Sequence, residues 1–107
     1  MSRTILTALA LLLFSAPTLS QTATYYSHHY TGKRMANGQR YHPDALIAAH
    51  PRHPIGTRLK VTNPKTGKSV IVTVSDRCSC SLDMSRAAFK QIAGLHAGRI
   101  SVTVSRI

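Results

Sequence analysis

The side chains that could carry out acid/base chemistry are few in this chain. The sequence contains three aspartates, six histidines and no glutamate. Two of the aspartates, Asp76 and Asp83, lie on either side of both cysteines, Cys78 and Cys80. Proton transfer to or from a substrate normally requires a positioned carboxyl group or imidazole. The candidates for such chemistry are therefore confined to Asp44, Asp76, Asp83 and the histidines.

The two cysteines allow at most one internal disulfide, and only one residue separates them. A bridge between Cys78 and Cys80 would close a very small ring and constrain little chain entropy. Intermolecular pairing, free thiols and a local redox-labile bridge all stay open. The pair could also bind a soft metal with a nearby histidine, but the sequence has no second regular ligand pair, so we expect no metal site.

The first twenty residues have the features of an export signal. Arg3 provides a positive start, an apolar run follows over residues 5–14, and small residues precede Gln21. The apolar run is shorter than the ~20 residues that a membrane-spanning helix needs, and no cysteine follows it to accept a lipid. We therefore expect residues 1–20 to be a signal peptide and residues 21–107 to form one exported domain, periplasmic or secreted, with no transmembrane segment and no lipid anchor.

The chain is strongly basic, with a formal net charge of +11. This charge favours polyanionic partners such as nucleic acid, anionic lipid or the carboxylates of a cell wall. A nucleic-acid-binding protein would be expected to show a recognition helix or aromatics interleaved with basic residues, and neither is evident, so we expect no nucleic-acid partner. The basic residues Lys33, Arg52, Arg58 and Arg77 could form either a solvated face or a groove for an acidic ligand.

The hydrophobic pattern is that of a small β protein with one helix. Strands are predicted over residues 23–27, 58–63, 69–75 and 100–104, with a turn between the second and the third. A helix is predicted over residues 86–93, with Ser85 as its N-cap and Gly94 just after its end. Residues 44–49 could form a single helical turn. Short strands with one helix favour a closed barrel.

Several sequence blocks are spread in order over nearly the whole chain after residue 20. These blocks are Ala-Thr-Tyr-Tyr at 23–26, Met-Ala-Asn-Gly at 35–38, residues 45–50, residues 54–63, Gly-Lys-Ser-Val at 67–70, Asp-Arg at 76–77 and residues 82–89. Together they resemble the rare lipoprotein A family. The resemblance implies a mainly β fold, a six-stranded double-psi β-barrel with one or two short helices, related to expansins.

The resemblance also implies an activity. Members of the family act as lytic transglycosylases on peptidoglycan glycan strands, with a preference for strands stripped of their peptides, and use no cofactor. In this chemistry the 6-hydroxyl of muramic acid attacks its own anomeric carbon and leaves a 1,6-anhydro end. One residue can then serve first as the acid and then as the base, whereas a hydrolytic glycosidase generally needs two carboxyl groups. A raised pKa would suit that residue.

The family resemblance assigns roles to individual residues. Asp76 matches the family's catalytic aspartate and is expected to be the principal acid/base. His50 matches its functional histidine and would assist Asp76 or orient the substrate. Asp83 falls on the aspartate that expansins require in their polysaccharide groove. Each of the three also has a structural reading, as a turn or helix cap for the aspartates and as a semi-buried histidine for His50.

The chain departs from the family pattern at two acidic positions and at the Gly-Pro that follows Asp-Arg, which is Cys78-Ser79 here. Gln39 and His42 stand where the family has acids, and Gln39 can hydrogen-bond a sugar but cannot exchange a proton. We expect Gln39, His42, Tyr26 and Arg77 to contact the glycan, Tyr26 by stacking on a sugar ring. The alternative to an enzyme is a noncatalytic, expansin-like module that binds peptidoglycan or another polysaccharide.

Overall fold

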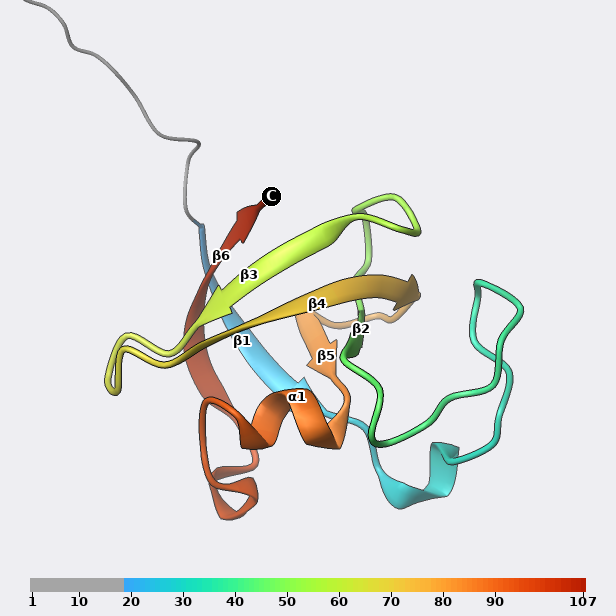
Figure 1. The fold of residues 1–107 in the computed structure, drawn as a ribbon, viewed down its shortest axis with the longest axis horizontal. Helices are drawn as coiled ribbons and strands as arrows, with labels where there is room; N and C mark the ends of the chain where they lie inside the picture. The colour runs from blue at the N-terminus through green and yellow to red at the C-terminus, as the bar shows by residue number, and fades with distance from the viewer. Residues whose placement is uncertain (1–18) are drawn as a thin grey trace, which may run out of the picture.

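The computed structural model describes residues 19–107, which form a closed six-stranded β-barrel (Figure 1). The order of strands around the barrel is β1-β5-β2-β4-β3-β6. Two pairs, β1 with β5 and β2 with β4, are parallel, and the other four are antiparallel. The elements are β1 (Leu19–Tyr25), η2 (His28–Tyr30), β2 (Ile47–Ala49), β3 (Arg58–Thr62), β4 (Ser69–Asp76), β5 (Leu82–Met84), α1 (Arg86–Lys90), η3 (Leu95–Ala97) and β6 (Ile100–Arg106). The six-stranded barrel expected from the sequence is confirmed.

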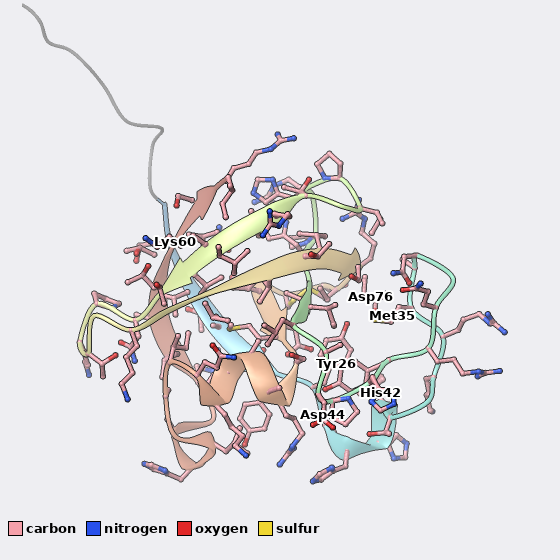
Figure 2. The ribbon with its side chains drawn as sticks, in the orientation of Figure 1. Tyr26, Met35, His42, Asp44, Lys60 and Asp76 are labelled. Carbon is pink, nitrogen blue, oxygen red and sulfur yellow. A yellow bond between two sulfur atoms is a disulfide. The ribbon has the colours of Figure 1, made fainter. Side chains whose placement is uncertain are left out.

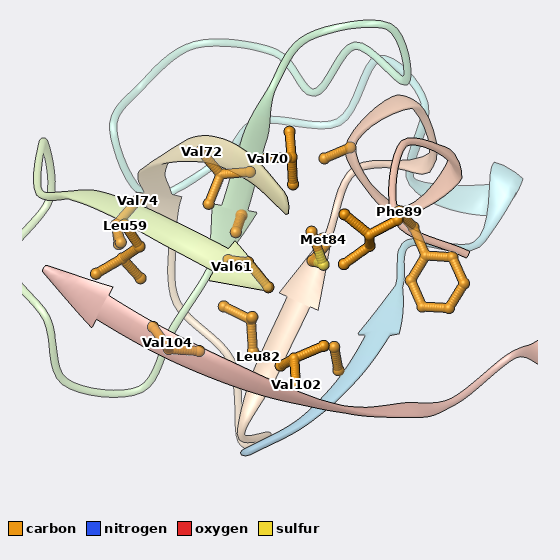
Figure 3. Close-up of a cluster of buried hydrophobic side chains, with 14 residues drawn as sticks. Leu59, Val61, Val70, Val72, Val74, Leu82, Met84, Phe89, Val102 and Val104 are labelled. Carbon is orange, nitrogen blue, oxygen red and sulfur yellow. The ribbon is translucent and has the colours of Figure 1, made fainter. Parts of the chain in front are cut away.

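The barrel interior is filled by alternate residues of its strands (Figure 3). Along β3 and the first part of β4, exposed and buried positions alternate, as expected for strands with one face on the core. The helix α1 adds Phe89, whose ring packs 4.8 Å from that of Tyr25 (centroid to centroid) near the end of β1. The fully buried core therefore consists mainly of Val, Leu, Ala and Met side chains with one aromatic ring.

The prediction of a helical turn over residues 44–49 is wrong. Residues Ile47–Ala49 form the short strand β2, which pairs with β4 on one side and with β5 on the other. Alanine favours helix in isolation, but the backbone groups of this segment bond to two neighbouring strands instead. Tertiary pairing therefore overrides local propensity at this position.

The predicted helix starts where expected but ends early. Ser85 caps it through a bond from the Ala88 N–H to the Ser85 hydroxyl (3.2 Å). The helix α1 ends at Lys90, and Gly94 is not its C-terminal glycine, since Gly94 has φ −73° and precedes η3. After this end, the side-chain amide of Asn63 donates to the Ile92 carbonyl (2.8 Å) and connects this segment to the β3–β4 turn.

The first strand begins at Leu19, two residues before the predicted boundary between leader and barrel. The first two residues of β1 pair with β6, Leu19 opposite Val104 and Ser20 opposite Thr103. The rest of the predicted signal peptide lies outside the described residues. Within residues 19–107, no helix has the length and apolar character needed to cross a membrane.

A bulge in β4 brings two aspartates into one row of the barrel. Ala48 pairs with Val74 but Ala49 pairs with Asp76, so Ser75 is an extra residue in β4. Strict alternation would turn Asp76 inward after the buried Val74, and a bulge of this kind re-aims the side chains that follow it. Asp76 thereby shares a row, on the outside of the barrel, with Ala49 of β2, Asp83 of β5 and Thr24 of β1.

The alternation of β3 and β4 gives a direct test of the core. Leu59 is fully buried, whereas Ile71, an isomeric side chain on the neighbouring strand, is 41% exposed. We expect Leu59→Ala to lower the free energy of unfolding by about 2–5 kcal/mol because it leaves a cavity. Ile71→Ala removes the same number of carbons from the outer face and should cost less than ~1 kcal/mol. Urea unfolding of both variants measures this, and equal losses would contradict the described burial.

Candidate functional site

The carboxylate of Asp76 joins three separate segments of the chain. Its Oδ1 atom accepts hydrogen bonds from the backbone N–H groups of Ala36 (2.8 Å) and Arg77 (2.9 Å). Its Oδ2 atom accepts a hydrogen bond from the Tyr26 hydroxyl (2.7 Å). Asp76 thus holds the end of β4 against the residue that follows β1 and against the loop of residues 31–41 (Figure 2).

The loop of residues 31–41 folds back on itself as a short hairpin. Backbone bonds connect Met35 with Gln39 and Lys33 with Tyr41, and Gly38 takes the positive φ (+90°) that its turn requires. The buried Met35 and Tyr41 anchor it on a second apolar cluster that also contains Tyr26 and Ala49. The loop therefore forms a wall beside the row of Asp76 and Asp83.

Asp83 lies in a different environment from Asp76. The hydroxyl of Thr24 donates to its Oδ1 atom (2.9 Å). Burial raises the pKa of the Asp83 carboxyl, and the negative charge of Asp76 raises it further, while the bond from Thr24 acts in the opposite direction. A raised pKa of this kind is what a proton donor requires.

His50 is 3% exposed and follows β2 directly. Its Nδ1 atom accepts hydrogen bonds from the backbone N–H groups of Arg52 and His53 (3.0 Å each), so we assign the ring proton to Nε2. This Nε2 atom is buried and has no hydrogen-bond partner among the described residues. Burial and the nearby basic side chains of His53, Arg52 and Arg77 lower the pKa of His50 to about 4, so the ring is neutral at pH 7.

Arg77 connects the end of β4 to the loop after β2. One nitrogen of its guanidinium, Nη1, donates to the backbone carbonyls of His50 (3.0 Å) and His53 (2.5 Å). In addition, the His50 N–H donates to the Asp76 carbonyl (3.1 Å). His50, Asp76 and Arg77 are therefore joined through backbone carbonyls.

The residues expected to contact sugar differ in how exposed they are. Tyr26 is buried, and its ring stacks on Tyr41 with centroids 4.2 Å apart, so the part of Tyr26 that reaches the site is its hydroxyl on Asp76. Burial and Asp76 raise the pKa of that hydroxyl. Gln39 and His42 are exposed, and Gln39 bonds within its own loop to Asn37. Within residues 19–107 neither Gln39 nor His42 hydrogen-bonds to an aspartate.

Cys78 and Cys80 form a disulfide, which selects the local bridge among the alternatives left open by the sequence. The bridge lies in the short segment between β4 and β5, and so between the two aspartates along the chain. Cys80 also lines two adjoining hollows, of ≈ 470 and ≈ 460 Å³, on the outer face of β1. The bridge therefore shapes a wall of these hollows.

The hollows contain residues that the sequence did not mark as a group. Both are lined by Thr22, Cys80 and Ser81, the first also by Arg52, and the second also by Thr24 and Arg99. They lie beside the aspartates and not over them, and Thr24 provides the link through its bond to Asp83. The only sequence signal was the alternation of Thr22, Thr24 and Tyr26, which places all three on one face of a strand.

The fold is that of a double-psi β-barrel, and comparison with known proteins gives the family. Residues 18–104 match the family model described as lytic transglycolase. The chain therefore belongs to the rare lipoprotein A-like family of double-psi β-barrels, as the sequence blocks indicated.

Curated relatives agree with this assignment. An uncharacterized protein of Synechocystis is 54% identical over 83% of this chain and 99% of its own length. A probable endolytic peptidoglycan transglycosylase RlpA of the same organism is 40% identical over 73% of this chain and 25% of its own length. The RlpA of Neisseria meningitidis is 35% identical over 84% of this chain and 39% of its own length. The chain thus spans between a quarter and two fifths of these transglycosylases.

Solved structures show the same barrel in proteins with other names. A Streptomyces papain inhibitor superposes with a TM-score of 0.71 at 25% identity, over 85% of this chain and 94% of the inhibitor. An expansin of Clavibacter michiganensis gives a TM-score of 0.68 at 31% identity, over 85% of this chain and 50% of the expansin. A mutant of that expansin was solved in complex with cellohexaose, and it superposes with a TM-score of 0.67 at 27% identity, over the same shares of the two chains.

The environment of His50 predicts a pH effect on stability. The pKa of His50 is lowered from 6.5 to about 4 by folding, so below pH 6.5 the unfolded chain takes up a proton that the folded chain does not. The stability that the neutral ring provides is present above pH 6.5 and is lost as the pH falls towards 4. His50→Asn removes the titration and keeps a side-chain acceptor for the two backbone donors.

Urea unfolding of both proteins at pH 7 and pH 4.5 measures this difference. Between pH 7 and pH 4.5 the wild type should lose more stability than His50→Asn, because the two proteins differ in no other titrating group. NMR titration should show the His50 ring neutral at pH 5.5. Equal losses, or a ring protonated at pH 5.5, would contradict the described burial.

Proposed function

We propose that this protein is a lytic transglycosylase that cleaves peptidoglycan glycan strands, with peptide-poor strands preferred, and forms 1,6-anhydromuramyl ends in cell-wall remodelling. The observation that carries the proposal is the row of Thr24, Asp83, Ala49 and Asp76, in which one carboxyl has a raised pKa and the other is held by three donors. Two carboxyl groups in different environments suit different roles in glycan chemistry.

In this proposal Asp83 carries the proton. Its carboxyl group is the one whose pKa is raised by burial and by the neighbouring charge of Asp76. The sequence ranked Asp76 first, but both Asp76 oxygens already accept hydrogen bonds from fixed donors. Asp76 then serves as the fixed carboxylate whose charge adds to the raised pKa of Asp83 and stabilises positive charge developing on the sugar.

The reaction needs no water. Asp83 donates its proton to the glycosidic oxygen as the bond between that oxygen and the anomeric carbon of muramic acid breaks. The 6-hydroxyl of the same sugar attacks the anomeric carbon, and its proton passes to the Asp83 carboxylate. The new bond closes the 1,6-anhydro ring, and Asp83 returns to its protonated form, ready for another cycle.

Tyr26 and His50 position the acids. The Tyr26 hydroxyl fixes one Asp76 oxygen, and its raised pKa keeps it a hydrogen-bond donor. The neutral His50 holds the loop after β2 through Nδ1 and lies against the end of β4, where it orients Asp76 and the adjacent Arg77. Gln39 and His42, which are exposed, are proposed to contact the glycan directly.

A noncatalytic wall-binding module is the second candidate. The loop of residues 31–41 carries Gln39 where the family has an acid, so it offers no carboxyl group to the site, and expansins have the same barrel. For both candidates we propose that the protein is exported to the periplasm or out of the cell and binds glycan there.

Product analysis separates the two candidates. The protein is incubated with purified peptide-free glycan strands, and 1,6-anhydromuramyl ends are measured by mass spectrometry. We expect Asp83→Asn to lower their formation by about 10²–10⁴-fold because the acid/base group is lost. Asp44→Asn is the matched control, since Asp44 is exposed and lies outside the row of Thr24, Asp83, Ala49 and Asp76. Binding without any anhydro product would favour the noncatalytic module.

The pH profile tests the division of roles between the aspartates. Removing the charge in Asp76→Asn should lower the pKa of Asp83, so the acid form is lost at a lower pH. The alkaline side of the pH–rate profile should therefore move to lower pH in Asp76→Asn and stay in place in Asp44→Asn. A profile that Asp76→Asn leaves in place would contradict the proposed coupling.

A further inference from the structure

The outer face of β1 connects the aspartates to two arginines. Thr22, Thr24 and Tyr26 alternate along this segment, so their side chains lie on one face. At one end Tyr26 bonds to Asp76 and Thr24 to Asp83. At the other end lie the two hollows that share Thr22, and each of them includes one arginine. We call this continuous polar surface the β1 track.

The two arginines are Arg52, after β2, and Arg99, just before β6. Both are exposed, and among residues 19–107 neither guanidinium donates a hydrogen bond to the protein. The guanidinium of Arg77, by contrast, donates hydrogen bonds to two backbone carbonyls. Arg52 and Arg99 are therefore available to a ligand, in hollows whose other lining residues are mostly Ser and Thr.

These groups suit a glycan that carries carboxylates. Serine and threonine hydroxyls can donate to and accept from sugar hydroxyls. A guanidinium presents several donors in a planar fork and binds a carboxylate in a bidentate manner. A neutral glycan would leave both arginines without an acceptor.

We propose that Arg52 and Arg99 bind the lactyl carboxylates of muramic acid in glycan strands whose stem peptides have been removed. In intact peptidoglycan this carboxyl group is an amide and carries no charge, and removal of the peptide leaves a free carboxylate on each muramic acid. The β1 track thereby recognises stripped strands and leads them to Asp83. The inference rests on the proposed function for the identity of the glycan.

The test compares two ligands that differ at the lactyl carboxyl group, which is charged in one and a neutral amide in the other. Stripped glycan strands are used as prepared, or after their carboxyl groups have been converted to methylamides. Binding is measured by isothermal calorimetry for the wild type, Arg52→Gln, Arg99→Gln and the double variant. Arg58→Gln, on β3 outside both hollows, is the control with the same change of charge. The anhydro products of the same samples are analysed in parallel.

We expect the wild type to bind the charged strands about tenfold more tightly than the methylamides, as for a charge-assisted hydrogen bond. Arg52→Gln and Arg99→Gln should each weaken binding of the charged strands by roughly threefold to tenfold. The same variants should leave binding of the methylamides unchanged, and Arg58→Gln should change neither ligand by more than about twofold.

Equal affinity of the wild type for both ligands would overturn the proposal, and so would an Arg58→Gln effect as large as those of Arg52→Gln and Arg99→Gln. Charge-selective binding that depends on Arg52 and Arg99 would support it even if no anhydro product formed. In that case the proposed reaction would fail and carboxylate recognition would stand. If both ligands bound with equal affinity and both gave anhydro products, the proposed reaction would stand and carboxylate recognition would fail.

Discussion

The site depends on the hydrogen bonding of a single carboxylate, that of Asp76. Its two oxygens accept from Tyr26, just after β1, from Ala36, in the loop of residues 31–41, and from the adjacent Arg77. Hydrogen bonds to a charged acceptor are among the stronger ones in proteins. The loop of residues 31–41 is held in addition by its anchor on Met35 and Tyr41 and by a bond from the Asn37 N–H to the Ser75 carbonyl of β4 (3.1 Å).

The bulge at Ser75 determines which way Asp76 points. Because it shifts the register of β2 against β4, Asp76 and Asp83 face the same side of the barrel on either side of Ala49. Adjacent strands lie about 4.8 Å apart, so the Cα atoms of the two aspartates are separated by about 10 Å. At that range the charge of one carboxylate acts on the other, which is one cause of the raised pKa of Asp83. A chain with three acids can thus obtain two distinct carboxyl groups from geometry alone.

The sequence predicted the elements whose patterns are long enough to read. The strands β3, β4 and β6 and the cap at Ser85 follow from alternation and turn chemistry. The strands β2 and β5 were not predicted, because three residues carry no periodicity and their pairing comes from their neighbours. Pairing of these two strands places Asp83 in the same row as Asp76. The sequence therefore identified both acids but not that they lie in one row. Likewise, the sequence grouped Arg52 with Arg58 and other basic residues. Only the fold shows that Arg52 lines a hollow beside β1 and that Arg58 does not.

The central claim is that Asp76 and Asp83 are coupled, so that Asp83 carries the proton. Carboxyl ¹³C NMR titration of the wild type and of Asp76→Asn measures this without any substrate. We expect Asp83 in the wild type to titrate above the ordinary range of an aspartate and to titrate at lower pH when the charge of Asp76 is removed. An Asp83 pKa that is ordinary in the wild type, or that Asp76→Asn does not change, would contradict the account.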